Sequence, residues 1–165
     1  MEYSKQMKIL PFSPEYQKGV IDLIVGIQQK EFKIDITADN QPDLHNIPDY
    51  YQKDNGNFWV AVIKSRVIGT ISLLDIGNKQ AALRKMFVNN EYRGAKYDVA
   101  FNLLETLLKW AGSRNLKQIY LGTTPKFLAA HRFYEKNEFI EIEKSELPER
   151  FPVMEVDTKF YKYSL

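Results

Sequence analysis

The order in which hydrophobic spacing changes along the chain is its strongest constraint on the fold. Three β-rich runs, 58–63, 67–74 and 81–88, follow one another with only short turn-forming segments between them. Short connections pair consecutive strands, so these runs predict an antiparallel meander. Apolar residues then recur at helical spacing over 99–111, and a short buried strand is expected over 118–121. Strands that alternate with helices only after the meander predict a mixed α/β sheet, parallel where a helix crosses over.

Elements on both sides of this centre complete the prediction. Ser13-Pro14-Glu15 is typical of a helix start, with a cap, a proline at the first helical position and an acidic first turn. Helical spacing then continues toward Phe32. The remaining expected elements are strands over 8–12, 139–142 and 153–163 and a helix after Thr124-Pro125. The 165 residues contain no repeat or linker and suit one hydrophobic core, so a single domain over 1–165 is expected.

Composition excludes several classes of chemistry and partner. The chain has no cysteine, which rules out disulfides, cysteine metal sites and a thiolate nucleophile from the protein itself. Two separated histidines do not make a metal site, so no metal is expected. A formal net charge of +2 is too small for a nucleic-acid-binding surface. Without a signal peptide or a long apolar span, the sequence favours a cytoplasmic protein with small partners and no membrane contact, and a homodimer stays open.

The segment 86–94 is the most informative for function, because a strand there ends in a turn just before the long amphipathic helix. A helix N-terminus presents unpaired N–H groups and partial positive charge, which favour a phosphate or pyrophosphate. Arg93 and Lys96 would reinforce such a site. The alternative is an ordinary turn with a solvated arginine.

This segment resembles the pyrophosphate-binding motif of the GNAT N-acetyltransferases, in which Tyr-Arg-Gly-x-Gly-x-Gly/Ala follows a strand and opens the central helix. A second GNAT signature, Ala-x-x-Phe-Tyr-x-x-x-Gly-Phe, is similar to residues 130–139, with Glu138 in place of the usual glycine. The resemblance runs from about 58 to 142. It implies a GNAT-like fold whose fourth and fifth strands splay apart to admit acetyl-CoA.

The resemblance also implies which residues would bind acetyl-CoA. The fourth strand would offer main-chain contacts to the pantetheine arm and the acetyl carbonyl, and the amides of the following loop would line the pyrophosphate. These residues are Met86, Phe87 and Val88 on the strand and Arg93, Gly94, Ala95, Lys96, Tyr97 and Asp98 in the loop.

Two residues of the loop depart from the family pattern. Lys96 and Asp98 stand where the family usually has glycines. A carboxylate directed at the pyrophosphate would repel it. Alternatively, Asp98 adopts a positive φ, caps the helix and faces the backbone, while Lys96 compensates its charge; this second interpretation is favoured. Phe127 occupies a position where the family often has a cofactor-contacting asparagine, so that contact is not expected here.

The resemblance makes Tyr134 the candidate catalytic acid, which would protonate the departing thiolate of CoA. Such a step is helped by a proton donor within about 3 Å. The alternative is a core tyrosine beside Phe133 and Phe139. His131, one helical turn away, is more simply explained as a structural residue.

A segment rich in acids is the candidate acceptor region. Over 31–57 the chain has six acidic and two basic residues. The family places its acceptor beside the first helix, which favours Glu31 as general base and Asp39 and Asp43 as substrate-binding residues. This arrangement implies a small, cationic amine acceptor. A solvated acidic loop without a function is the alternative.

Two functional hypotheses therefore follow. The first is an acetyl-CoA-dependent N-acetyltransferase that transfers the acetyl group directly to an amine, since the protein has no thiol to carry it. The second is a non-enzymatic acyl-CoA-binding or partner-binding module with the same fold.

Overall fold

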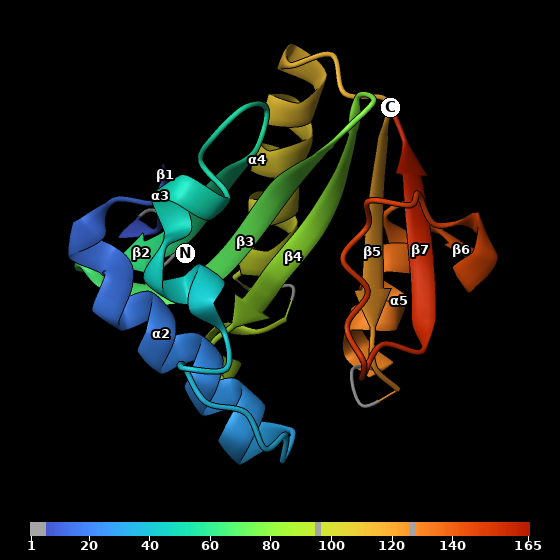
Figure 1. Cartoon of the computed structure of the whole chain (residues 1–165). Helices are drawn as coiled ribbons and strands as arrows, with labels where there is room; N and C mark the ends of the chain where they lie inside the picture. Colours follow the sequence, from blue (N-terminus) through green and yellow to red (C-terminus); the bar gives the residue numbers. More distant parts are fainter. Residues whose placement is uncertain (1–5, 95–96, 126–127) are drawn as a thin grey trace.

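A seven-stranded mixed sheet forms the centre of the computed structural model, which describes residues 6–94, 97–125 and 128–165 (Figure 1). The strand order is β1-β2-β3-β4-β5-β7-β6. The strands are β1 (Lys8–Pro11), β2 (Asn57–Ile63), β3 (Arg66–Gly77), β4 (Gln80–Val88), β5 (Gln118–Thr123), β6 (Ile140–Ile142) and β7 (Lys159–Ser164). The helices are α2 (Gln17–Gly26), α3 (Ile47–Tyr50), α4 (Val99–Ser113) and α5 (Leu128–Lys136). The predicted meander, crossover helix and mixed sheet are confirmed.

The sheet divides between β4 and β5. All pairs from β1 to β4 are antiparallel, whereas β4 and β5 run parallel and pair at only three positions, from Gln80 with Gln118 to Ala82 with Tyr120. Beyond Ala82 the two strands continue without pairing, and Figure 1 shows them diverging. The predicted splay of the fourth and fifth strands is therefore present.

The two faces of the sheet are covered by different elements. Helices α4 and α5 pack on what we call the α4 face, where Leu83, Leu121 and Tyr134 belong to one buried cluster. Helices α2 and α3 cover the opposite face, here called the α3 face, where Ile24 and Ile47 pack against β2. The α3 face continues past the split as a cluster that includes Ala82 of β4, Tyr120 of β5 and Phe160 of β7. The split is thus an opening between two packed halves of one sheet.

Two predicted elements differ in detail. The first helix starts as a 3₁₀ turn over Pro14–Tyr16 and ends in a π-helical turn over Ile27–Glu31, a feature often found at functional sites. The last strand begins only at Lys159, and most of 153–158 has no regular structure. No helix in the described part of the chain is both long and apolar enough to cross a membrane.

The acidic segment is more ordered than a solvated loop. It contains a 3₁₀ turn over Pro42–His45 and the short helix α3, and each has a proline in its first turn. Leu44, Ile47 and Tyr51 are fully buried and dock this segment on the α3 face. Pro42 and Pro48 suit these positions, because the first helical positions need no N–H donor.

Candidate active site

A bulge in β4 shapes the strand beside the split. The pairing with β3 shifts between Thr70 and Ser72, which face Phe87 and Arg84 respectively, and Lys85 has a φ of +55°. The hydroxyls of Thr70 and Ser72 donate hydrogen bonds of 2.7 Å to the carbonyls of Lys85 and Arg84. An extra residue in one strand places neighbouring side chains on one face, and Arg84 and Lys85 indeed both have partners on the α3 face.

A cavity of about 830 Å³ opens beside β4 on the α4 face. Its walls come from the end of β4, the loop before α4, the first turn of α4, helix α5 and the end of the first helix. Phe101 and Leu128, two large apolar side chains that are exposed, line this cavity. Of the residues expected to bind acetyl-CoA or act on it, the cavity brings together Met86, Phe87, Val88, Arg93, Gly94, Asp98, Tyr134 and Glu31.

The loop before α4 uses two positive φ angles. Gly94 has a φ of +98° and Asp98, at the N-cap of α4, a φ of +53°. The amides of Tyr97 and Asp98 both donate to the carbonyl of Gly94, at 3.2 and 3.3 Å. The expected positive φ of Asp98 is confirmed, but its side chain makes no capping hydrogen bond. Ala95 and Lys96, also expected at the pyrophosphate, lie outside the described residues, as does Phe127.

Arg93 joins the loop to both β4 and the first helix. Its Nε donates to the carbonyl of Val88 at 2.8 Å, and its two terminal nitrogens bind both carboxylate oxygens of Glu31. The candidate base and a candidate pyrophosphate ligand are therefore ion-paired with each other. A bidentate pair of this kind is strong and directional. The role of Glu31 as a base stays a prediction, and it would require the carboxylate to leave Arg93.

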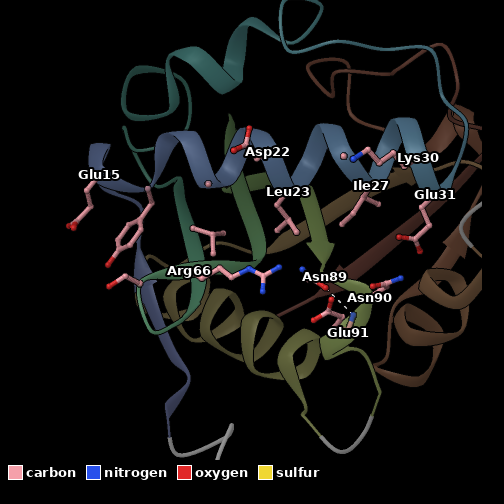
Figure 2. Close-up of a pocket in the computed structure, with 15 residues that line it drawn as sticks. Glu15, Asp22, Leu23, Ile27, Lys30, Glu31, Arg66, Asn89, Asn90 and Glu91 are labelled. Carbon is pink, nitrogen blue, oxygen red and sulfur yellow. Dashed lines mark hydrogen bonds between the residues drawn. The ribbon is translucent and has the colours of Figure 1, made fainter.

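Glu31 also borders a second hollow, shown in Figure 2. This groove of about 760 Å³ runs along α2, and its other side is formed by the start of β3 and the residues after β4. It shares only Ile27 and Glu31 with the cavity beside β4. The end of the first helix is therefore the wall between the two hollows.

Tyr134 lies at the inner end of the cavity. Its hydroxyl is 3.6 Å from the sulfur of Met86, so helix α5 brings it to the free edge of β4. The aromatic rings of Phe139 and Tyr161 surround it. Burial raises the pKa of Tyr134, which keeps the phenol protonated at neutral pH. His131, one turn earlier, is buried with Nε2 at 2.9 Å from the carbonyl of Thr124, as expected of a structural histidine.

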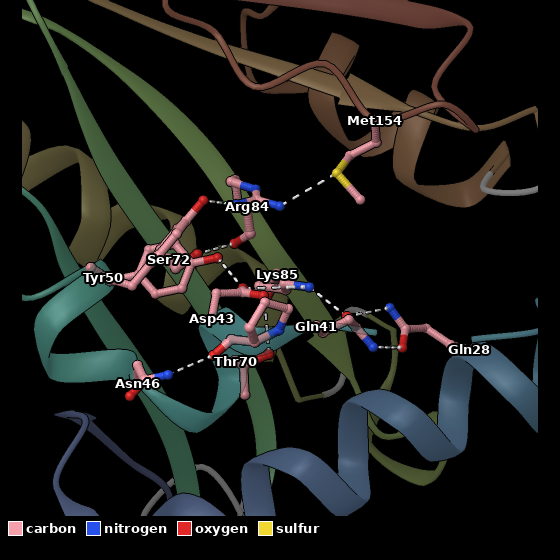
Figure 3. A network of polar contacts seen from close by, with 12 residues as sticks. Gln28, Gln41, Asp43, Asn46, Tyr50, Thr70, Ser72, Arg84, Lys85 and Met154 are labelled. Carbon is pink, nitrogen blue, oxygen red and sulfur yellow. Dashed lines mark hydrogen bonds and ion pairs between the residues drawn. The ribbon is translucent and has the colours of Figure 1, made fainter. Parts of the chain in front are cut away.

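The two acids expected to bind substrate differ sharply in environment. Asp39 is exposed, with His45 at 3.7 Å. Asp43 is buried, accepts a hydrogen bond of 2.5 Å from the hydroxyl of Tyr51 and lies 3.6 Å from the ammonium group of Lys85 (Figure 3). Asp43 thus serves first as the internal counterion of a buried lysine.

Burial lowers the pKa of Lys85 to about 8; Arg84 acts in the same direction and Asp43 in the opposite one. The ammonium group also donates a hydrogen bond to Gln41, which exchanges hydrogen bonds with Gln28 (Figure 3). This network ties β4 to the π-helical turn of the first helix and to the acidic segment.

Sequence reasoning missed three charged residues near the split: Arg84, Lys85 and Asp157. A signal existed for the first two, since adjacent charges inside an otherwise apolar strand break the alternation of faces. Asp157 lies against Gly122 of β5, where an added Cβ would come within 2.6 Å of its carboxylate. Nothing in the sequence around it marks Asp157. Within the described ranges, no three acidic or histidine side chains converge as metal ligands would.

Comparisons with known proteins agree with this geometry. The chain is 37% identical over 97 residues to an N-acetylaspartate synthetase of Xenopus tropicalis, covering 56% of this chain and 34% of the relative. It is 29% identical over 99 residues to the human N-acetyltransferase 8B, covering 56% and 43%. The chain thus spans about a third of the length of the first of these relatives.

Solved structures match over nearly the whole chain. A GNAT-family acetyltransferase of Staphylococcus aureus Mu50 superposes with a TM-score of 0.91 at 37% identity, covering 96% of this chain and 98% of the other. An acetyltransferase of Streptococcus agalactiae gives 0.92 at 32% identity, covering 98% and 99%. The family model described as the acetyltransferase (GNAT) family matches residues 22–139, more than half of the sequence. The chain therefore belongs to the GNAT family of acetyltransferases.

Proposed function

We propose that this protein is an N-acetyltransferase that transfers the acetyl group of acetyl-CoA directly to a primary amine of a small acceptor. The observation that carries the proposal is the split between β4 and β5, with a cavity on the α4 face and the Tyr134 hydroxyl 3.6 Å from the Met86 sulfur. Family membership supports acetyl-CoA as the acyl donor.

The residues that line the cavity suit the chemistry of CoA. Arg93 and the turn at Gly94 offer a cation and a backbone that comes close without a Cβ, which suits a pyrophosphate. Phe101 and Leu128 offer an apolar wall for the pantetheine arm. On β5, beyond its last pair with β4, the hydroxyl of Thr123 is buried and has no partner within the described ranges, so a ligand in the split would satisfy it.

Acetyl-CoA supplies the thioester whose carbonyl carbon an amine attacks. In the proposed reaction the free edge of β4 at Met86 and Val88 orients the acyl group, and Tyr134 donates its proton to the sulfur as the carbon–sulfur bond breaks. The raised pKa of Tyr134 suits an acid that must be protonated before the reaction. We keep Glu31 as the proposed base, with Arg93 released to the pyrophosphate when the cofactor binds.

The acceptor is proposed to be cationic at its amine, as the acidic segment suggested. Of the two acids that prompted this prediction, Asp39 is free to meet a substrate at the surface, whereas Asp43 has an internal partner. Relatives named N-acetylaspartate synthetase support an acceptor of amino-acid size. The cytoplasmic location and the homodimer remain predictions from the sequence.

Calorimetry with acetyl-CoA, followed by a thiol-release assay on a panel of primary amines, tests the proposal. We expect binding of acetyl-CoA and release of CoA that depends on an amine. Binding without turnover on any amine would favour the acyl-CoA-binding module instead. No binding at millimolar acetyl-CoA would refute the acetyltransferase and the acyl-CoA-binding module alike, and would favour the partner-binding module.

A further inference from the structure

We infer that Arg84 binds a carboxylate on the amine acceptor, so that the acceptor is an amino acid rather than a simple amine or a polyamine. This inference rests on the proposed function and names the chemical class of its acceptor. It comes from the charges on the α3 face of the split, which the cofactor cavity on the α4 face does not use.

Side chains of both faces of the sheet border the split between β4 and β5. Met86 and Tyr134 belong to the cluster on the α4 face. Ala82 of β4 and Tyr120 of β5 pack together on the α3 face. Arg84 lies two residues after Ala82, and Gly122 lies two residues after Tyr120. Side chains alternate along a strand, so Arg84 and the carboxylate resting on Gly122 both lie on the α3 face. An acceptor arriving there would meet the acyl group across the split.

Arg84 reaches across the α3 face from β4. Its guanidinium donates a hydrogen bond of 3.0 Å to the hydroxyl of Tyr50 in α3 and lies 3.6 Å from the sulfur of Met154 in the segment before β7 (Figure 3). Both partners are neutral. In the described part of the chain, no carboxylate oxygen lies within 4.0 Å of this guanidinium. Arg84 is partly buried, and its hydrogen bonds go only to neutral atoms. A planar guanidinium is suited to bind a carboxylate through two parallel hydrogen bonds, and Arg84 has no such partner among the described residues.

The charged residues near Arg84 are not ion-paired with it, so we assign the role of its anion to the carboxylate of the substrate. Lys85, also on the α3 face, is already paired with the buried Asp43. Asp157 is close enough for Arg84 to lower the pKa of its carboxyl, although burial has the larger effect and raises that pKa. Asp157 and Arg84 are nevertheless not ion-paired. An anion and a cation held apart on one face complement an amino acid, whose ammonium would face Asp157 and whose carboxylate would face Arg84.

The spacing suits a short acceptor. Arg84 precedes Met86 by two residues, which is about 7 Å along a strand and less across a bulge. Met86 in turn contacts the candidate catalytic acid, Tyr134. A carboxylate held by Arg84 would therefore keep an amine one to three carbon atoms away close to the reacting thioester.

Matched acceptor pairs test the inference in the wild-type protein, without any variant. Thiol release is measured with glycine, β-alanine and L-aspartate, and with the corresponding compounds in which every carboxylate is a carboxamide. We expect kcat/KM to be about 10- to 100-fold higher for at least one amino acid than for its amide, since a charged hydrogen-bonding group on the substrate is then matched. Equal use of all acids and amides would overturn the inference while leaving the acetyltransferase proposal intact.

Variants of Arg84 test whether this residue causes the preference for an amino acid over its amide. Arg84→Met should raise KM for the amino acid about 10- to 100-fold and remove the preference over the amide, while KM for acetyl-CoA stays within about twofold. Arg84→Lys should retain part of the preference, because it keeps the charge without the fork. Arg66→Met, which removes an exposed arginine at the start of β3, is the matched control and should change neither value. An equal loss with acid and amide in Arg84→Met would contradict the inference.

Calorimetry on the complex with CoA distinguishes failure of the proposed Arg84 site from failure of the proposed acetyltransferase activity. Binding of an amino acid that Arg84→Met abolishes would support the site even if no acceptor were acetylated, in which case only the proposed activity would fail. Turnover of amines combined with equal amino-acid binding by wild type and Arg84→Met would refute the site alone.

Discussion

At the scale of single residues, Tyr134 is the side chain whose surroundings best match a chemical task. It is buried, its pKa is raised, and its hydroxyl meets the free edge of β4. We expect Tyr134→Phe to lower kcat about 100-fold and to leave KM for acetyl-CoA nearly unchanged, because only the proton donor is removed. Steady-state kinetics with varied acetyl-CoA measure both values.

Tyr161→Phe is the matched control for this substitution. Tyr161 is also fully buried, its ring centre lies 6.0 Å from that of Tyr134, and its hydroxyl donates a hydrogen bond of 2.6 Å to Glu135 rather than facing the cavity. Its removal should lower stability without lowering kcat. A Tyr134→Phe enzyme as active as wild type would show that Tyr134 is only a core residue.

Contacts between residues far apart in the sequence could not be predicted at this scale. The resemblance placed Arg93 and Glu31 in one site, but their ion pair joins residues 62 positions apart and could not be inferred from either segment. Asp43 was expected to meet substrate, and its burial depends on Tyr51 and on Lys85 of a distant strand. Residue type and spacing indicate which groups carry charge, but not which charges neutralise one another.

At the scale of elements, β4 borders the candidate active site, and the register of its bulge against β3 could not be derived from the sequence. The meander and helix α4 follow directly from hydrophobic spacing. The bulge instead depends on how β4 registers against β3, where Thr70 and Ser72 hydrogen-bond its carbonyls. Propensity scales contain no term for such a contact, so they do not indicate that two adjacent cations lie on one face of β4.

The buried lysine of this bulge should make stability depend on pH. Its pKa is about 8 in the folded protein and about 10.4 in an unfolded chain, so between these values the unfolded state binds more protons. Stability should therefore rise as pH increases through this range, by about 1 kcal/mol between pH 7 and pH 9 from Lys85 alone. Urea denaturation at the two pH values measures this gain.

Lys85→Met should remove the part of the gain in stability between pH 7 and pH 9 that comes from Lys85. Lys18→Gln is the control, because Lys18 is an exposed lysine paired with Asp22 and should leave the gain as in wild type. Tyr51 limits the range at the alkaline end: burial raises its pKa well above the usual value, so the folded state loses stability once unfolded tyrosines ionise above about pH 10. A gain from pH 7 to pH 9 that is the same in Lys85→Met and wild type would show that the lysine is not buried as a cation.

At the scale of the whole molecule, the split proposed to admit the cofactor is also where the two halves of the sheet are joined by few residue pairs. Three residue pairs connect β4 to β5, whereas six connect β5 to β7. The proposed CoA site draws on both halves, with Met86 on one side and Tyr134 on the other. Acetyl-CoA should therefore stabilise both halves together, by about 2.7 kcal/mol at a concentration of 100 times its Kd, which corresponds to about 5 to 10 °C in Tm.

Hydrogen exchange distinguishes this joint stabilisation from a local effect. If opening either half destroys the site, the slowest amides of β2 and β3 and those of β5 and β7 should all be slowed by acetyl-CoA to a similar degree, since a ligand protects every opening that abolishes its binding. Protection confined to β5 and β7 would mean that β1 to β4 unfold independently of the ligand. In that case the split would separate two cooperative units, and the substrate would be held by one of them.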